Sequence, residues 1–182
     1  MILVINTSGG DIEFVLGSHH ARIASAKQSV DIAPQCEKFM QSASVKWSDL
    51  RAIAVVVGPG SFTGIRLGIA YAKGLAIGLN IPVIPINAFE LYHADTPDAF
   101  VAIDSGRGDF FVAAPGLEPC IMTIDDVETR QMAWPRTVGH KPFNLDNATK
   151  IAAKKIESGN IPPVVPMYLR PSYAEQPNGN KK

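Results

Sequence analysis

The sequence is most informative at residues 52–79, which read AIAVVVGPGSFTGIRLGIAYAKGLAIGL. The first six of these residues are rich in β-branched side chains and predict a parallel strand that is covered on both faces. A glycine-rich loop follows over residues 58–64, and the apolar run 65–79 predicts a long helix. Strand, glycine loop and helix in this order favour an α/β fold.

The predicted helix carries small residues at regular spacing. One row, at four-residue intervals, consists of Gly64, Gly68, Ala72 and Ala76, and a second row consists of Ala70, Gly74 and Gly78. Each glycine inside a helix costs about 1 kcal/mol relative to alanine, so close packing of the helix is expected to offset that cost. A helix that is apolar nearly all round must be covered on two sides. One cover is its own sheet, and the other is either a second lobe or another chain.

A repeat links the two halves of the sequence. Residues 2–15 align without gaps with residues 100–113, and Ile5/Ile103, Gly10/Gly108 and Asp11/Asp109 are identical pairs. Each copy has the pattern strand, polar turn, strand. The repeat predicts a duplicated architecture with lobes at residues 1–98 and 99–174, followed by a flexible tail at 175–182.

The remaining elements follow from local signals. We expect strands near residues 11–16, 20–26, 82–86, 120–122 and 136–139, and an extended segment at 161–166. A helix at 32–43 would hold Pro34 in its first turn. A capping box predicts a helix that starts after Asn87, and another helix is expected from near Asp146 to Gly159.

The composition excludes several classes of protein. The chain has 182 residues, 46% hydrophobic and 19% charged, with 17 basic and 17 acidic side chains and a net charge of zero. A protein that bound nucleic acid alone would normally carry a basic excess. The two cysteines have no CxxC spacing, and no apolar run approaches the length of a membrane span. The start of the chain has no basic n-region, so we expect a cytoplasmic protein with no membrane contact.

Familiar catalytic patterns are missing from the sequence. The glycine loop lacks the Lys-Ser/Thr of a Walker A motif and is one residue too long for a dinucleotide fingerprint. The four histidines form no helical metal pair, and Ser61 does not lie in a GxSxG elbow. Weak candidates for nucleotide or Mg²⁺ binding are Asn6, Asp104 and Asp109. We therefore predict no catalytic residue and no metal site in this chain, with an ATP-dependent phosphotransferase or ATPase acting alone as the alternative.

Several segments resemble one protein family, TsaB (YeaZ), the bacterial subunit of the tRNA threonylcarbamoyladenosine machinery. They are residues 2–8 (ILVINTS), 55–68 (VVVGPGSFTGIRLG), 72–76 (AKGLA), 81–83 (IPV), 102–108 (AIDSGRG) and 166–170 (PMYLR). The resemblance implies a duplicated actin-like, sugar-kinase-like (RNase H-like) fold with two lobes of mixed sheets flanked by helices. The family usually has Asp where this chain has Asn6.

The resemblance also implies a role and partners. TsaB-like proteins lack the metal-binding histidines of TsaD, bind that catalytic subunit, and with the ATPase TsaE support threonylcarbamoyl transfer to the adenosine beside the anticodon of ANN-decoding tRNAs. They self-associate through a similar surface, and tRNA contact is expected only through the complex. ATP or ADP is likewise expected only at the level of the complex. The implied interface lies on the predicted helix, with candidate contacts Phe62, Gly64, Ile65, Gly68, Ile69, Ala72, Lys73, Ala76 and Ile77.

Overall fold

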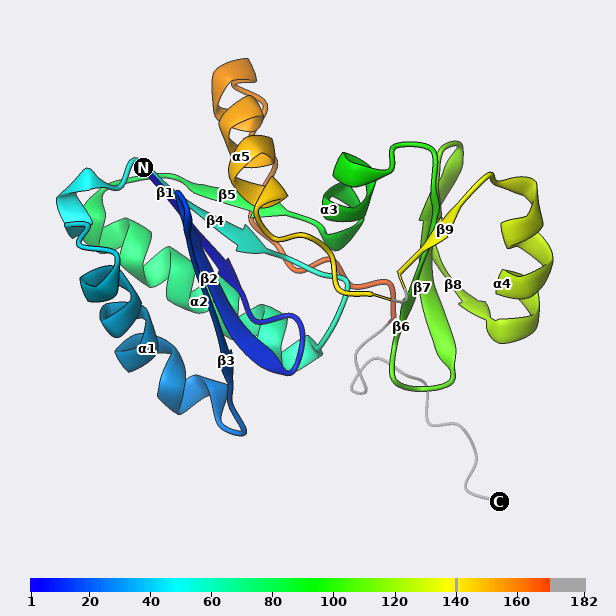
Figure 1. Cartoon of the computed structure of the whole chain (residues 1–182), viewed down its shortest axis with the longest axis horizontal. Coiled ribbons are helices and arrows are strands. Elements are labelled where there is room, and N and C mark those ends of the chain that lie inside the picture. The colour runs from blue at the N-terminus through cyan, green and yellow to red at the C-terminus, as the bar shows by residue number, and fades with distance from the viewer. Residues whose placement is uncertain (140, 171–182) are drawn as a thin grey trace.

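Two β-sheets form the centres of two lobes (Figure 1). The computed structural model describes residues 1–139 and 141–170. The first sheet has the order β3-β2-β1-β4-β5, and the second has the order β8-β7-β6-β9. The strands are β1 (Ile2–Asn6), β2 (Asp11–Leu16), β3 (His19–Ala24), β4 (Ala52–Val56), β5 (Val83–Ile86), β6 (Phe100–Asp104), β7 (Asp109–Ala114), β8 (Leu117–Thr123) and β9 (Thr137–Val138).

The two sheets share one topology, as the sequence repeat predicts. In each lobe three antiparallel strands follow one another, and a later strand joins the first of them in parallel: β4 beside β1, and β9 beside β6. The two hairpins differ in register by one residue, because Asn6 pairs with Glu13 whereas the aligned Asp104 pairs with Phe110. The duplicated α/β architecture is confirmed at the level of strand order.

Helices cover both faces of the first sheet. On one face lie α1 (Gln28–Ser42) and α2 (Phe62–Leu79), which pack against Leu3 and Ile5 of β1. On the other face, α5 (Asn147–Ser158) packs against Val4. This follows from the alternation of side chains along a strand, where neighbouring residues point to opposite faces.

Helix α1 begins earlier than the sequence predicts. It starts at Gln28 rather than at residue 32, so Pro34 lies beyond the first turn. The proline has no N–H to donate to the carbonyl of Val30 one turn earlier, and Val30 lies on the exposed side of the helix. The helix therefore tolerates a residue that the sequence analysis confined to its start.

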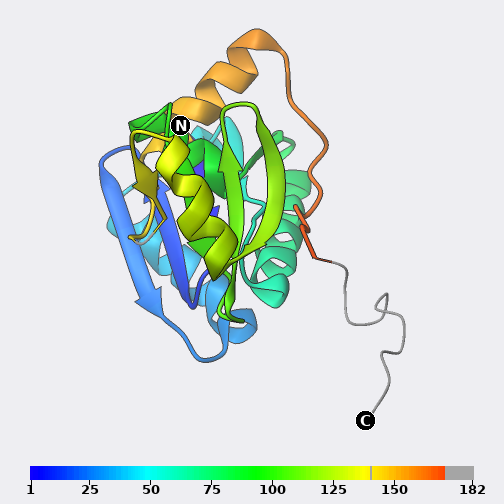
Figure 2. The same cartoon turned by 90° about the vertical axis from the view of Figure 1, so that its right-hand side faces the viewer.

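Helix α3 (Ala88–Asp95) lies between the lobes (Figure 1). Its Leu91 packs in the core of the first sheet, and its Phe89 packs with Val101 of the second. The predicted capping box is confirmed: the Asn87 side chain accepts from the Glu90 N–H at 2.8 Å, and Glu90 Oε2 accepts from the Asn87 N–H at 2.8 Å. The outer face of the second sheet is covered by α4 (Ile124–Arg130), which lies in the foreground of Figure 2.

The last part of the described chain returns to the first lobe. The sequence repeat places residues 99–174 in the second lobe, but Ala148 and Ala152 of α5 pack on the first sheet. The expected helix from Asp146 to Gly159 does form, with Gly159 in the left-handed conformation at its end. The boundary at residues 98 and 99 thus separates the two sheets, while α5 belongs with the first. The expected tail at 175–182 lies outside the described residues.

A half-buried ion pair fixes α5 to the first lobe. The Lys155 ammonium lies 2.7 Å from Glu90 of α3 and donates to the carbonyl of Pro85 at 2.8 Å.

Within the part of the chain that the structure describes, no helix combines the length and hydropathy needed to cross a membrane.

Candidate functional site

The glycine loop is held against the turn that follows β1. The backbone N–H of Ser61 donates to the carbonyl of Ser8 at 2.7 Å, and the Thr7 hydroxyl donates to the carbonyl of Gly64 at 2.7 Å. Ser61 is the N-cap of α2, and its side chain accepts from the Gly64 N–H at 3.3 Å. Helix α2 thus starts at residue 62, three residues before the sequence predicts, because the cap residue lies inside the loop.

The first small-residue row of α2 faces the chain's own sheet. A Cβ placed on Gly64 would overlap the carbonyl oxygen of Thr7, and one on Gly68 would overlap the Thr7 hydroxyl and lie 3.5 Å from Val55. The residues of α2 that are buried within the chain are Gly64, Ile65, Gly68, Ile69, Ala72 and Ala76. These six were expected to contact a partner, and the structure corrects that expectation: they allow the helix to approach β1 and β4 instead.

The second small-residue row is on the exposed side of α2. A Cβ placed on Gly74 or Gly78 would meet nothing within 4 Å, and Ala70 is exposed as well. Ile77 lies beside this row with 82% of its surface exposed. Among the candidate contacts, Lys73 and Ile77 are therefore exposed, and Phe62 is half-buried. The exposed Ile77 and the small residues beside it form a surface on which a second helix can pack closely.

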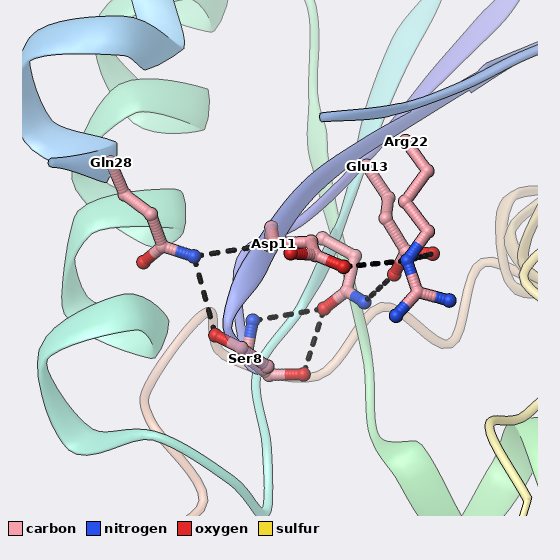
Figure 3. A network of polar contacts seen from close by, with 7 residues as sticks. Ser8, Asp11, Glu13, Arg22 and Gln28 are labelled. Carbon is pink, nitrogen blue, oxygen red and sulfur yellow. Dashed lines mark hydrogen bonds and ion pairs between the residues drawn. The ribbon is translucent and has the colours of Figure 1, made fainter. Parts of the chain in front are cut away.

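The candidate Asn6 is buried and hydrogen-bonded to two residues that are labelled in Figure 3, Ser8 and Glu13. It is 3% exposed; its amide nitrogen donates to Glu13 at 2.6 Å, and its oxygen accepts from the N–H and the hydroxyl of Ser8 at 3.0 and 2.7 Å. Both polar atoms of this side chain are thus used inside the chain. They fix the turn after β1 rather than reaching toward a ligand.

The same turn is stiffened from both sides (Figure 3). The Arg22 guanidinium of β3 donates to Asp11 at 2.6 Å and lies 4.0 Å from Glu13. The hydrogen bond with Asp11 and the charges of both carboxylates raise the pKa of Arg22. From α1, Gln28 donates to the carbonyls of Gly9 and Asp11 at 3.2 and 3.0 Å.

The corresponding turn of the second lobe engages the other two candidates. Asp104 accepts from the N–H of Gly106 at 2.7 Å, which is the local turn contact typical of aspartate. Asp109 accepts from the Ser105 hydroxyl and forms an ion pair with Arg170. Over residues 1–139 and 141–170, no group of three or more His, Cys, Asp and Glu side chains is placed to hold a metal ion.

A cavity of about 370 Å³ opens where the lobes meet. It lies between the glycine loop, the turn after β6 and the segment at residues 167–170. On one side of it, the Phe62 and Tyr168 rings stack with centroids 4.7 Å apart, and the Arg66 guanidinium lies 3.8 Å from the Phe62 centroid and donates to the Tyr168 hydroxyl at 2.6 Å. The lining residues are Pro59, Gly60, Ser61, Phe62, Thr63, Ser105, Arg107, Phe111, Met167, Tyr168, Leu169 and Arg170. The sequence analysis did not predict this cavity, because its walls come from three distant segments.

The buried cysteine has a structural position. Cys36 of α1 is fully buried beside Tyr71 of α2. Burial raises the pKa of the Cys36 thiol from its ordinary value of 9.0 to about 11, and the hydrogen bond with Tyr71 lowers it by a smaller amount. A thiol with this pKa stays protonated at neutral pH, so it packs as a small apolar group.

Comparison with known proteins finds relatives that are named for tRNA modification. The family model described as TsaD, tRNA N6-adenosine threonylcarbamoyltransferase, matches residues 18–166. The tRNA threonylcarbamoyladenosine biosynthesis protein TsaB of Haemophilus influenzae is 32% identical over 102 residues, which cover 52% of this chain and 42% of that protein. A tRNA N6-adenosine threonylcarbamoyltransferase of Clostridium perfringens is 34% identical over 109 residues, which cover 56% of this chain and 32% of that protein. The chain thus spans less than half the length of these curated relatives.

The solved structures extend the likeness to the whole fold. YeaZ from Pseudomonas aeruginosa superposes with a TM-score of 0.72 at 16% identity, over 92% of this chain and 99% of that one. The two-lobed actin-like architecture expected from the sequence is confirmed by this match and by the shared strand order of the two lobes. The glycine loop, the turn after β6 and residues 166–170, which carry the sequence resemblance, are brought together at the junction of the lobes. By its family model, the chain belongs to the TsaD family, described as tRNA N6-adenosine threonylcarbamoyltransferase, and it is similar to TsaB in sequence and to YeaZ in fold.

Proposed function

We propose that this chain is a non-catalytic cytoplasmic subunit that binds a TsaD-type catalytic protein and, with a TsaE-type ATPase, supports threonylcarbamoyl transfer to the adenosine beside the anticodon of ANN-decoding tRNAs. Family membership supports a role in this tRNA modification, because relatives of both the TsaB and the TsaD kind carry tRNA and the threonylcarbamoyl group in their names. The neutral net charge fits a subunit that meets tRNA through its partner.

The observation that carries the proposal is the exposed face of α2. The helix buries one small-residue row against its own sheet and leaves the second row open beside Ile77. Four helical glycines would be costly without close packing, and packing within the chain accounts only for Gly64 and Gly68. A partner helix lying along Gly74 and Gly78 accounts for the other two. We therefore assign Lys73 and Ile77 to the partner interface, and expect the same face to support self-association.

The test is sedimentation velocity on the chain, alone and mixed with the TsaD-type protein of the same organism. We expect a heavier mixed species for the unchanged chain and for Ile124→Glu, which alters an exposed isoleucine of α4 on the other lobe. Ile77→Glu places a charge in the apolar contact and should abolish the heavier species. If Ile77→Glu binds the partner as tightly as Ile124→Glu does, α2 is not the interface. If the unchanged chain gives two separate boundaries even with TsaE and ATP present, the subunit role itself is wrong.

The alternative of an ATPase acting alone requires the carboxylates of the second lobe. Asp104 and Asp109 are already engaged by Gly106, Ser105 and Arg170, which favours the subunit role. ATP turnover by the isolated chain, lost in Asp104→Ala, would reverse this preference.

A further inference from the structure

The first sheet ends in an open edge at β3, which the proposed partner face of α2 does not include. Among the described residues, no strand pairs with the outer side of β3, which lies on the left in Figure 2. The inner side pairs with β2 in unbroken register, from Leu16 with His19 to Asp11 with Ala24. An edge of this kind presents unpaired N–H and C=O groups, to which another strand can bond.

The other three sheet edges are each protected by a local feature. In β5, Pro85 has no N–H to donate, and its carbonyl accepts from Lys155 at 2.8 Å. Strand β8 contains Pro119, and the pairing of β7 with β8 is irregular between Val112 and Ala114. Strand β9 has only two residues. By contrast, β3 has six residues, no proline and no irregular pairing, so it is the edge to which a strand can be added.

The hairpin of β2 and β3 determines which groups point outward. Its loop has two residues, so the pair that closes it, Leu16 with His19, is hydrogen-bonded. Hydrogen-bonded pairs alternate with non-bonded pairs along an antiparallel ladder. The N–H and C=O groups of His20, Arg22 and Ala24 therefore point away from β2 and are available to a new strand.

The charged side chain of β3 does not block this edge. A charge that points outward from an edge strand normally repels an added strand. The Arg22 guanidinium instead lies back over β2, where it donates to Asp11 at 2.6 Å and lies 4.0 Å from Glu13 (Figure 3). Its charge is thus balanced within the chain.

Helix α1 carries two opposite charges on the side that faces β3. Asp31 accepts from the hydroxyl of Ser25, the residue after β3, at 2.6 Å, so this side of α1 is turned toward the edge. Lys38 follows Asp31 by two helical turns, lies on the same side and is exposed. A second α1 helix in antiparallel orientation beside the first would bring each Lys38 opposite an Asp31.

We propose that β3 pairs in antiparallel orientation with β3 of a second copy of this chain, about a two-fold axis through Ala21, so that two five-stranded sheets join into one. Such an axis stands perpendicular to the sheet and keeps the faces of both copies in common. With Ala21 on the axis, the outward groups of His20 bond to those of Arg22 of the second copy. An axis through Arg22 would instead place two like charges opposite each other.

The same symmetry brings the two α1 helices to one face in antiparallel orientation, so the charges of Asp31 and Lys38 are complementary across the axis. Like charges at these positions would have opposed the pairing. The exposed face of α2 stays open in such a dimer, because α2 packs over β1 and β4 rather than over β3. The dimer is therefore independent of the proposed partner role, and either can fail without the other.

Sedimentation velocity of the full-length Ile77→Glu chain over a range of concentrations tests the pairing. This background removes the self-association expected at α2, and we expect it to form a dimer that dissociates on dilution. Adding His20→Pro removes an outward N–H without removing a bond to β2, and should abolish the dimer at an unchanged circular dichroism spectrum. Adding His20→Ala keeps the N–H and should leave the dimer intact. A chain that is monomeric at every concentration overturns the proposal, as does a His20→Pro variant that dimerises like His20→Ala.

A charge change and amide exchange test the same edge without a proline. Lys38→Glu places a like charge opposite Asp31 in both copies and should weaken the dimer about tenfold. Lys150→Glu makes the same change on an exposed residue of α5, on the other face of the sheet, and should have no effect. The amide hydrogens of His20 and Arg22 should exchange more slowly in the dimer than after dilution. Equal dimerisation of the two lysine variants overturns the proposal, and so does slow exchange in the monomer, because another part of the chain would then cover the edge.

Discussion

The close approach of α2 to β1 predicts opposite effects for the same substitution at two positions of one helix. Gly64→Ala places a methyl group inside the carbonyl oxygen of Thr7 and 3.1 Å from its carbonyl carbon, and a backbone group cannot turn away. Gly74→Ala places the same methyl group where nothing lies within 4 Å. Both changes raise the helix propensity equally, so the difference between them isolates the packing.

The magnitudes follow from these contacts. Replacing a helical glycine by alanine contributes about 1 kcal/mol of stability where space is free, so Gly74→Ala should raise the free energy of unfolding by that amount. Overpacking costs typically 1–3 kcal/mol, and a backbone neighbour places Gly64→Ala at the upper end of that range. After the propensity gain, a net loss of about 2 kcal/mol is expected for Gly64→Ala. The two variants should therefore differ by about 3 kcal/mol.

Urea unfolding followed by circular dichroism measures both variants. The fluorescence of Trp47 in the first lobe and Trp134 in the second shows whether the lobes unfold together. A Gly64→Ala variant whose free energy of unfolding equals or exceeds that of the unchanged protein would refute the packing of α2 on β1. So would a Gly74→Ala variant that loses stability, because it would mean that this face is already covered within the chain.

Three further predictions rest on single groups. Folding raises the pKa of the Cys36 thiol from 9.0 to about 11, so between pH 9 and 11 the thiol is protonated in the folded chain and ionised in the unfolded chain. The free energy of unfolding should therefore fall as pH rises from 9 to 11. Urea titrations at several pH values measure this slope, which Cys36→Ala should flatten. Asp109→Asn removes the ion pair with Arg170 and should lower the free energy of unfolding by about 1–2 kcal/mol. The second lobe should then unfold at a lower urea concentration. An unchanged transition would mean that water screens the pair so well that it adds no stability. Lys155→Met leaves Glu90 without its cation and should lower the melting temperature, as measured by calorimetry; an unchanged value would show that apolar contacts alone hold α5.

The parts of the fold that the sequence predicts are those with local causes. The strand, loop and helix at residues 52–79, the capping box at Asn87 and the left-handed Gly159 each depend on residues a few positions apart. The repeat of residues 2–15 and 100–113 adds the duplication, because both copies use the same turn chemistry. These features could be read directly because neighbouring residues determine them.

The parts that the sequence does not predict are decided by distant residues. Spacing shows that Gly64 and Gly68 lie on one side of a helix, but only the folded chain shows that Thr7 occupies that side. The repeat places α5 with the second lobe, whereas its apolar face fits the first sheet. The ion pair of Asp109 with Arg170, and the cavity beside it, join residues that no local pattern connects.

The return of α5 to the first sheet has a consequence for how the protein is made. A chain leaves the ribosome from its N-terminus, so strands β1, β4 and β5 are complete long before α5 is synthesised. Until then Val4, Ala54 and Ile84, all fully buried in the finished protein, lie on an uncovered apolar face. The first lobe therefore completes its folding only after α5 has been synthesised, and a fragment ending at residue 98 would aggregate rather than fold.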